Sequence, residues 1–98
     1  MIKKKVAELL ARRARSAAPV VYGAELGYRG AVHWVADNPE TLDPERGWVS
    51  YSVWLVYRDP YGDWGQRLVG RMSVLGDQVN IWDRERLLYR FALDGRRG

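Results

Sequence analysis

The chain contains no cysteine and only one histidine, His33. Disulfide bonds and cysteine-ligated metals are therefore excluded, and small secreted domains normally depend on disulfides. One histidine also excludes a histidine-rich metal site. These absences predict a cytoplasmic protein that holds neither a metal nor a small-molecule cofactor.

Long apolar runs and nucleotide-binding loops are also missing. No stretch approaches the roughly 18 apolar residues that span a membrane, and Glu8 interrupts the first apolar segment, unlike a secretory signal. Neither GxGxxG nor GxxxxGK[ST] occurs. His33 has no partnered nucleophile, and the aspartates at expected strand ends lack the spacing of a two-metal nuclease. The sequence therefore predicts no enzymatic activity.

Positive charge is concentrated in the first segment. The 98 residues carry a net charge of +4, and within residues 1–18 six basic side chains oppose Glu8 alone. The six are Lys3, Lys4, Lys5, Arg12, Arg13 and Arg15. Such a segment attracts polyanions, although a solvated helix face would look the same. A basic amphipathic helix can also lie on an anionic membrane, but this one has no Trp or Phe on its apolar side.

The same segment has helical periodicity. Apolar residues at positions 2, 6, 9, 10 and 17 form one stripe, and Pro19 ends the segment. The pattern predicts an amphipathic helix over residues 2–17.

The middle of the chain is strand-like, and residues 48–58 alternate between an apolar or aromatic face and a more polar one. The sequence predicts strands over 31–36, 48–58, 64–75 and 78–82, with a polar loop over 37–47 and a hairpin turn at Gly76-Asp77. Pairing Tyr57 with Trp64 places Val53 opposite Leu68 and Trp54 opposite Arg67. Residues 84–94 fit a helix, which is favoured, or a strand of alternating Leu, Tyr and Phe.

These elements predict a single α+β domain over residues 1–98. The N-terminal amphipathic helix packs on an antiparallel β-meander, about 31–82, of four to five strands, with a C-terminal element over 84–94. Val49, Tyr51, Val53, Leu55 and Tyr57 form the core side of the meander.

The opposite side of the meander is rich in tryptophan and arginine. It carries Trp48, Trp54, Trp82, Arg67 and Arg71 among serines and Asn80. Flat rings stack on unpaired bases and guanidiniums contact phosphates. We therefore predict a nucleic-acid-binding protein, with single-stranded DNA as the partner and the basic helix supplying long-range attraction.

Two alternatives remain open for this side of the meander. A helix of the same chain could cover it, because each helix needs a sheet to bury its stripe. Trp, Tyr and Arg are also enriched at protein–protein hot spots. The face could then serve a protein partner or a homo-oligomer that binds no nucleic acid.

The layout also resembles a known group, the ThermoDBP-related single-stranded-DNA-binding proteins of thermophilic archaea. The resemblance rests on the basic helix Lys3–Arg15 and on the segments WVSYSVWLVYR and WGQRLVGRMSV. It implies binding of single-stranded DNA through a cleft of hydrophobic and aromatic residues and a tendency to form oligomers. The low content of Asn, Gln and Cys agrees with a thermophilic source.

Overall fold

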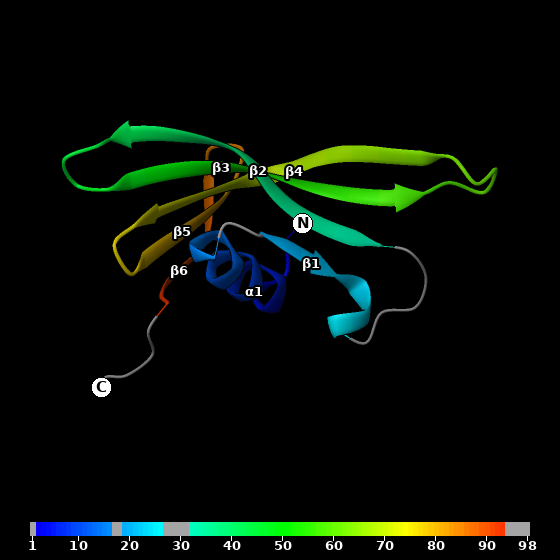
Figure 1. Cartoon of the computed structure of the whole chain (residues 1–98), viewed down its shortest axis with the longest axis horizontal. Coiled ribbons are helices and arrows are strands. Elements are labelled where there is room, and N and C mark those ends of the chain that lie inside the picture. Colours follow the sequence, from blue (N-terminus) through cyan, green and yellow to red (C-terminus); the bar gives the residue numbers. More distant parts are fainter. Residues whose placement is uncertain (1, 17–18, 27–31, 94–98) are drawn as a thin grey trace.

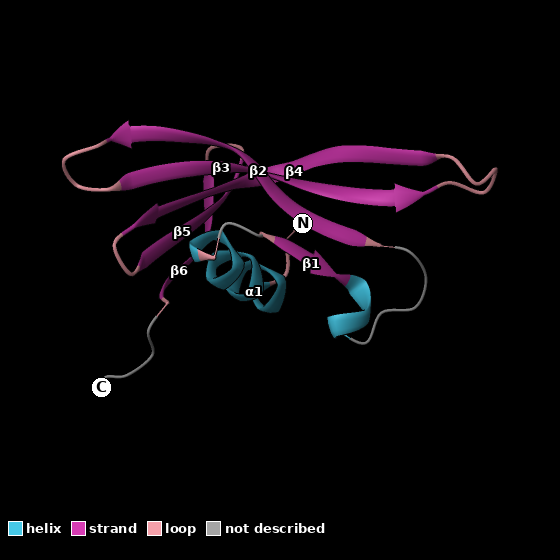
Figure 2. Cartoon of the chain, viewed as in Figure 1, coloured by secondary structure: helices cyan, strands magenta, loops and turns pink. Residues whose placement is uncertain are grey.

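One helix packs on one face of a six-stranded sheet (Figure 1, Figure 2). The computed structural model describes residues 2–16, 19–26 and 32–93. The helix α1 is Lys4–Arg15, and a 3₁₀ turn, η1, is Gly23–Leu26. The strands are β1 (Val20–Tyr22), β2 (His33–Asp43), β3 (Trp48–Arg58), β4 (Trp64–Leu75), β5 (Gln78–Asp83) and β6 (Arg86–Ala92). The predicted α+β architecture is confirmed, with six strands instead of four to five.

The strands follow one another across the sheet in chain order. Each pairs antiparallel with the next, so the sheet is a continuous meander from β1 to β6. Figure 1 shows the sheet bending around α1, with β1 on one side of the helix and β5 and β6 on the other. We call the face that carries α1 the inner face and the opposite one the outer face.

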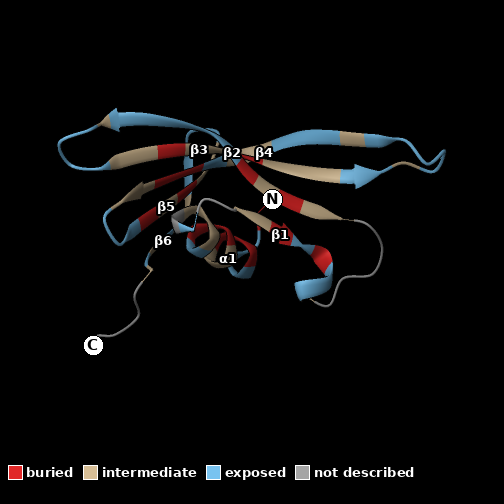
Figure 3. Ribbon diagram, viewed as in Figure 1, coloured by how far each residue is buried: buried red, intermediate tan, exposed pale blue. Residues whose placement is uncertain are grey.

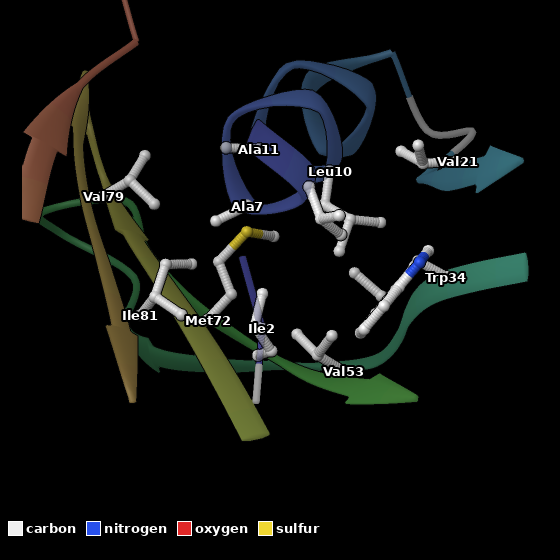
Figure 4. Close-up of a cluster of buried hydrophobic side chains, with 12 residues drawn as sticks. Ile2, Ala7, Leu10, Ala11, Val21, Trp34, Val53, Met72, Val79 and Ile81 are labelled. Atoms are coloured by element: carbon white, nitrogen blue, oxygen red, sulfur yellow. The ribbon is translucent and has the colours of Figure 1, made fainter. Parts of the chain in front are cut away.

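The core lies between α1 and the inner face. Figure 4 shows side chains from the helix and from β1 to β5 converging there, and Figure 3 shows the buried residues gathered in the same place. Val53, Met72 and Ile81 are fully buried, as the strand alternation predicts. The other buried hydrophobic residues are Ile2, Val6, Ala7, Leu10, Ala11, Val21, Trp34, Ala36 and Val79.

The sequence of α1 favours both helix formation and close packing. Most of its residues are strong helix formers, and its two small buried residues, Ala7 and Ala11, allow a close approach to the sheet. Its last turn is closed by Ser16, whose hydroxyl donates to the carbonyl of Arg13 at 2.9 Å. Among the described residues, no helix is long and apolar enough to cross a membrane. The predicted limits at residues 17, 31 and 94 lie outside the described residues.

The C-terminal element is a strand, and the favoured helical interpretation is wrong. In β6, Phe91 lies opposite Val79 and Tyr89 opposite Ile81. Both therefore extend the inner face beside buried residues of β5. Tyr89 and Phe91 follow the period of two of the predicted alternative, a strand, whereas a register shift between Ile81 and Trp82 places Leu87 opposite Trp82 on the outer face.

Strand β2 continues through most of the predicted polar loop. The loop was expected over 37–47, but β2 pairs with β3 as far as Asp43. Two irregularities fall where the sequence suggested a loop: one between Asp37 and Glu40, which includes Asn38 with a φ of 53° and Pro39, and one between Thr41 and Asp43. Proline is tolerated there because β1 pairs only with residues 33–35, which leaves this part of β2 at the sheet edge.

The β3–β4 register differs from the predicted one. Tyr57 lies opposite Gly65 instead of Trp64, and Trp54 lies opposite Leu68 instead of Arg67. The turn has the expected five residues, 59–63, but Arg58 rather than Tyr57 lies opposite Trp64. The backbone N–H of Asp59 donates to the carbonyl of Asp63 at 2.8 Å, and the Asp59 carboxylate accepts the backbone N–H of Tyr61 and Asp63, each at 2.9 Å.

A second irregularity, a bulge at Val69, restores the predicted faces farther along. Beyond it Val53 lies opposite Gly70 and Tyr51 opposite Met72. The predicted inner and outer faces are therefore correct from residue 70 to 75 of β4 and inverted from 64 to 68. The predicted register between β4 and β5 is confirmed, with Leu75 opposite Gln78 and Trp82 opposite Arg71.

Glycine is required at position 70 by close packing. A Cβ atom there would meet the carbonyl oxygen of Trp82 and would lie 2.8 Å from Cδ1 of Ile2. We expect Gly70→Ala to lower the free energy of unfolding by about 1–3 kcal/mol, because the backbone of β5 cannot yield. Urea unfolding would measure this. Gln66→Ala, at an exposed position of the same strand, should change it by less than about 0.5 kcal/mol.

Candidate nucleic-acid interface

Among the described residues the outer face carries no helix, but its exposure is uneven, since the paired residues Ser50 and Ser73 are each only 5% exposed. In Figure 1 both α1 and η1 lie on the other side of the sheet, and no helix among the described residues packs on this face. Directly opposite residues of antiparallel strands share a face. Trp54, opposite Leu68, and Trp82, opposite Arg71, therefore both belong to the outer face.

The outer-face tryptophans lie half-buried. Trp48, Trp54 and Trp82 are each partly exposed. The indole N–H groups of Trp48 and Trp54 are buried and have no hydrogen-bond partner among the described residues. Since nitrogen is the only polar atom of an indole ring, the exposed ring surface of these two residues is carbon, which suits stacking.

A groove opens on this face where β5 ends. Strand β5 pairs only with residues 71–75 of β4, and the backbone of Trp82 still lies against Gly70, so residues 64–69 have a neighbouring strand on one side only. The groove at this open edge has a volume of about 590 Å³. It is lined by Ser52, Arg67, Leu68, Val69, Gly70, Arg71, Asp83 and Arg84. Trp54 and Trp82 flank it through their cross-strand neighbours Leu68 and Arg71.

The groove brings together both predicted arginines of the meander by different routes. Arg71 keeps its predicted outer face, opposite Ser52 and Trp82. Arg67 lies opposite Leu55, on the inner-face side, because of the altered register. It still lines the groove, since no strand covers that edge of β4.

Three guanidinium groups surround the groove without a protein partner. Those of Arg67, Arg71 and Arg84 make no hydrogen bond or ion pair with any residue that the structure describes. All three side chains are exposed, and Asp83 is the one acid among the lining residues. The groove therefore has an excess of positive charge that an anion could neutralise.

Arg84 is held in a backbone conformation that arginine rarely adopts. Its φ is 57°, in the left-handed region, which costs a non-glycine residue roughly 1–2 kcal/mol. It occupies the two-residue connection between β5 and β6. Arg84 also lines the groove, so a residue with a strained backbone supplies one of the guanidinium groups of the groove.

Acidic side chains border the outer face on β2, a feature the sequence interpretation missed because it treated this segment as a loop. Asp37 lies opposite Ser52, Glu40 opposite Ser50 and Asp43 opposite Trp48. Asp43 pairs with Arg46 at 3.4 Å. The outer face is thus polarised, with acids along β2 and arginines along β4 and its neighbours, and Trp48 belongs to the acidic part.

The basic helix lies on the other side of the sheet from the groove. Lys3 caps α1, and Lys4, Lys5 and Arg12 are exposed on it. Arg13 donates to Glu25 of η1 at 2.8 Å. Arg15 is the last residue of α1, and its side chain lies outside the described part. The structure therefore does not bring the two predicted groups of basic residues together.

The sequence interpretation missed three residues of the face. It favours a helix at Arg84, and its register puts Leu68 and Trp64 on the core side, whereas the structure places both on the outer face. The Asp-Arg-Glu-Arg run between two alternating segments was the available signal for a hairpin at Arg84. Nothing in the sequence alone marks the bulge at Val69.

No protein-family model matches the chain, and no match was found among curated proteins or solved structures. The resemblance to the ThermoDBP-related proteins thus stays a prediction. Among the described residues, no group of three or more His, Asp or Glu side chains is arranged to hold a metal ion.

The assignment of tryptophans to the two faces can be tested by stability. Trp34 is 8% exposed in the core, so Trp34→Ala should lower the free energy of unfolding by about 3–5 kcal/mol. Trp82→Ala should cost no more than about 2 kcal/mol, because the ring is half-buried on the outer face. Urea unfolding of both variants provides the comparison, and equal losses would contradict an open outer face.

Proposed function

We propose that the protein binds single-stranded nucleic acid, with single-stranded DNA as its ligand, through the arginine groove of the outer face. The observation that carries this proposal is the groove itself, in which three guanidiniums have no hydrogen-bond or ion-pair partner among the described residues. The role is one of binding without catalysis.

Phosphates fit the chemistry of the groove. A guanidinium presents a planar set of donors that matches phosphate oxygens, and it remains charged at every physiological pH. Arg67, Arg71 and Arg84 would each neutralise a phosphate and release counterions, which makes affinity depend on salt. Asp83 opposes this charge only in part.

The flanking rings favour unpaired bases over a duplex. Trp54 and Trp82 lie half-buried beside the groove and expose ring surface. Stacking on an aromatic side chain is worth about 1–3 kcal/mol per base and needs a base whose faces are free. In a duplex those faces are occupied by neighbouring bases.

The basic helix contributes at a distance. Lys4, Lys5 and Arg12 are exposed on α1, across the sheet from the groove. A strand bound in the groove would not touch them, but their positive field would raise the rate of encounter at low salt. Substitutions on α1 should therefore alter association more than dissociation.

The open edge of β4 supports a second candidate, the addition of a strand from a protein partner or from another copy. Residues 64–69 offer backbone groups on their free side, as in β-augmentation. The bulge at Val69 and the arginines disfavour this, because bulges and charges are devices that block edge pairing. Light scattering without oligonucleotide would reveal such an assembly as a dimer or larger species.

Binding can be tested with the strained arginine. Single-stranded oligonucleotides should quench the tryptophan fluorescence of the wild type. Arg84→Gly should weaken binding about ten- to a hundredfold through loss of a charged hydrogen bond and reduce the log–log salt slope by about 0.7. Its unfolding free energy should not fall, since glycine adopts a positive φ freely. Fluorescence titration at several salt concentrations measures the first two quantities.

Arg46→Ala is the matched control for this experiment. Arg46 is exposed in the β2–β3 turn and pairs with Asp43, away from the groove. Its removal should leave the salt slope unchanged. Failure of DNA and RNA oligonucleotides to quench the wild type at low salt would refute the proposal.

The acidic border provides a test in the opposite direction. The double variant Asp37→Asn, Glu40→Gln removes two carboxylates from the outer face beside the groove residue Ser52. Affinity should rise about two- to fivefold at about 50 mM salt and lose this gain at about 300 mM, because screening weakens the repulsion. Unchanged affinity at low salt would show that the nucleic acid does not follow this face.

A further inference from the structure

A second aromatic cluster lies on the outer face near the β3–β4 turn. The rings of Tyr22 and His33 meet edge to face with centroids 4.7 Å apart, and those of His33 and Trp64 lie 5.5 Å apart. The guanidinium carbon of Arg58 lies 5.5 Å from the centre of the Trp64 ring. We call these four residues the Trp64 cluster.

Four different strands build this cluster. Tyr22 lies opposite His33, and Arg58 opposite Trp64, so the cluster crosses β1 to β4. Arg58 also donates from Nε to the carbonyl of Gly62 at 3.0 Å, which fixes its position in the turn. The cluster is therefore a preformed surface and not a chance approach of mobile side chains.

Trp64 is the outer-face tryptophan best placed to stack on a ligand. It is 53% exposed, whereas Trp48, Trp54 and Trp82 are only partly so. Trp64 lies on the outer-face side of β4, opposite Arg58, so its ring does not belong to the buried core. A large exposed ring held against a guanidinium resembles the pairing of aromatic and cationic groups used to bind bases and phosphates together.

The position of the cluster relates it to the groove. Trp64 and the groove residue Leu68 lie on the same face of β4, four residues apart, which is about 13 Å along a strand. Gln66, between them on that face, is exposed and uncharged. The outer face of β4 therefore connects the groove to the cluster without an intervening acid on that strand.

We infer that the Trp64 cluster is a second stacking site for a base of the same single strand whose phosphates occupy the groove. This inference rests on the proposed function. A strand of a few nucleotides would fill the groove alone, and a longer one would extend along β4 and place a base on Trp64 with a phosphate beside Arg58.

The inference is tested by the dependence of affinity on oligonucleotide length. Trp64→Ala should weaken binding of an oligothymidylate of about 10 nucleotides by about 5- to 100-fold, the value of one stacked base. It should change binding of about 3 nucleotides by less than about twofold. Fluorescence anisotropy of labelled oligonucleotides measures both, and Trp64→Phe should recover most of the loss because it keeps a ring.

Tyr61→Ala is the control. Tyr61 is 92% exposed in the same turn and makes no ring contact among the described residues. Its replacement should affect neither length. Since Trp64 is exposed, circular dichroism should show each variant folded.

The outcomes separate this inference from the function on which it rests. If Trp64→Ala leaves the long oligonucleotide unaffected, or weakens both lengths equally, the second stacking site is refuted while binding in the groove stands. If the wild type binds neither length at low salt, the proposed function itself fails.

Discussion

The burial of one helical stripe against one face of the sheet is the constraint on which the rest of the structure depends. Only α1 has a face apolar enough to form a core with the strands, and it packs between β1 and β5 on the inner face. Because the one long helix of the described residues packs on the inner face, no second helix covers the outer face, and its residues must tolerate contact with water. Serine, arginine and half-buried tryptophan meet that requirement because each combines polar groups with packing surface.

The bulge at Val69 converts this open face into one with a shaped site. Without the extra residue, β3 and β4 would keep one register from end to end. With it, Leu68 and Trp64 join Trp54 on the outer face, while Arg67 turns toward the edge of β4. Bulges bend a strand and re-aim its side chains, and they are frequent beside functional sites. The bulge therefore sets the orientation of Trp64 in the Trp64 cluster and of Arg67 and Leu68, which line part of the groove.

Much of the fold could be predicted from the sequence because its periodicities are local. The stripe of α1, the alternation in β3 and β5, and the Gly76-Asp77 turn follow from residue spacing, and the structure confirms them. The register of β3 and β4 could not be predicted, since it depends on how the carboxylate of Asp59 closes the turn and on a bulge without a sequence signal. The same limit applies to the site: Arg71 and the tryptophans were placed correctly on their face, whereas Arg84, Trp64 and the acids of β2 needed the three-dimensional pairing.

Several departures from an ideal meander converge at one place. Strand β5 has 6 residues beside the 12 of β4, which leaves an edge open. The bulge at Val69 lies on that edge, and the non-glycine residue Arg84 adopts a positive φ at its border. Matched strand lengths, regular pairing and glycine in the turn would each be more stable. Local rules tend to be broken where a site requires it. Three guanidiniums without a partner among the described residues gather at this point, so the groove is the part of the fold where departures from ideal geometry coincide with uncompensated positive charge.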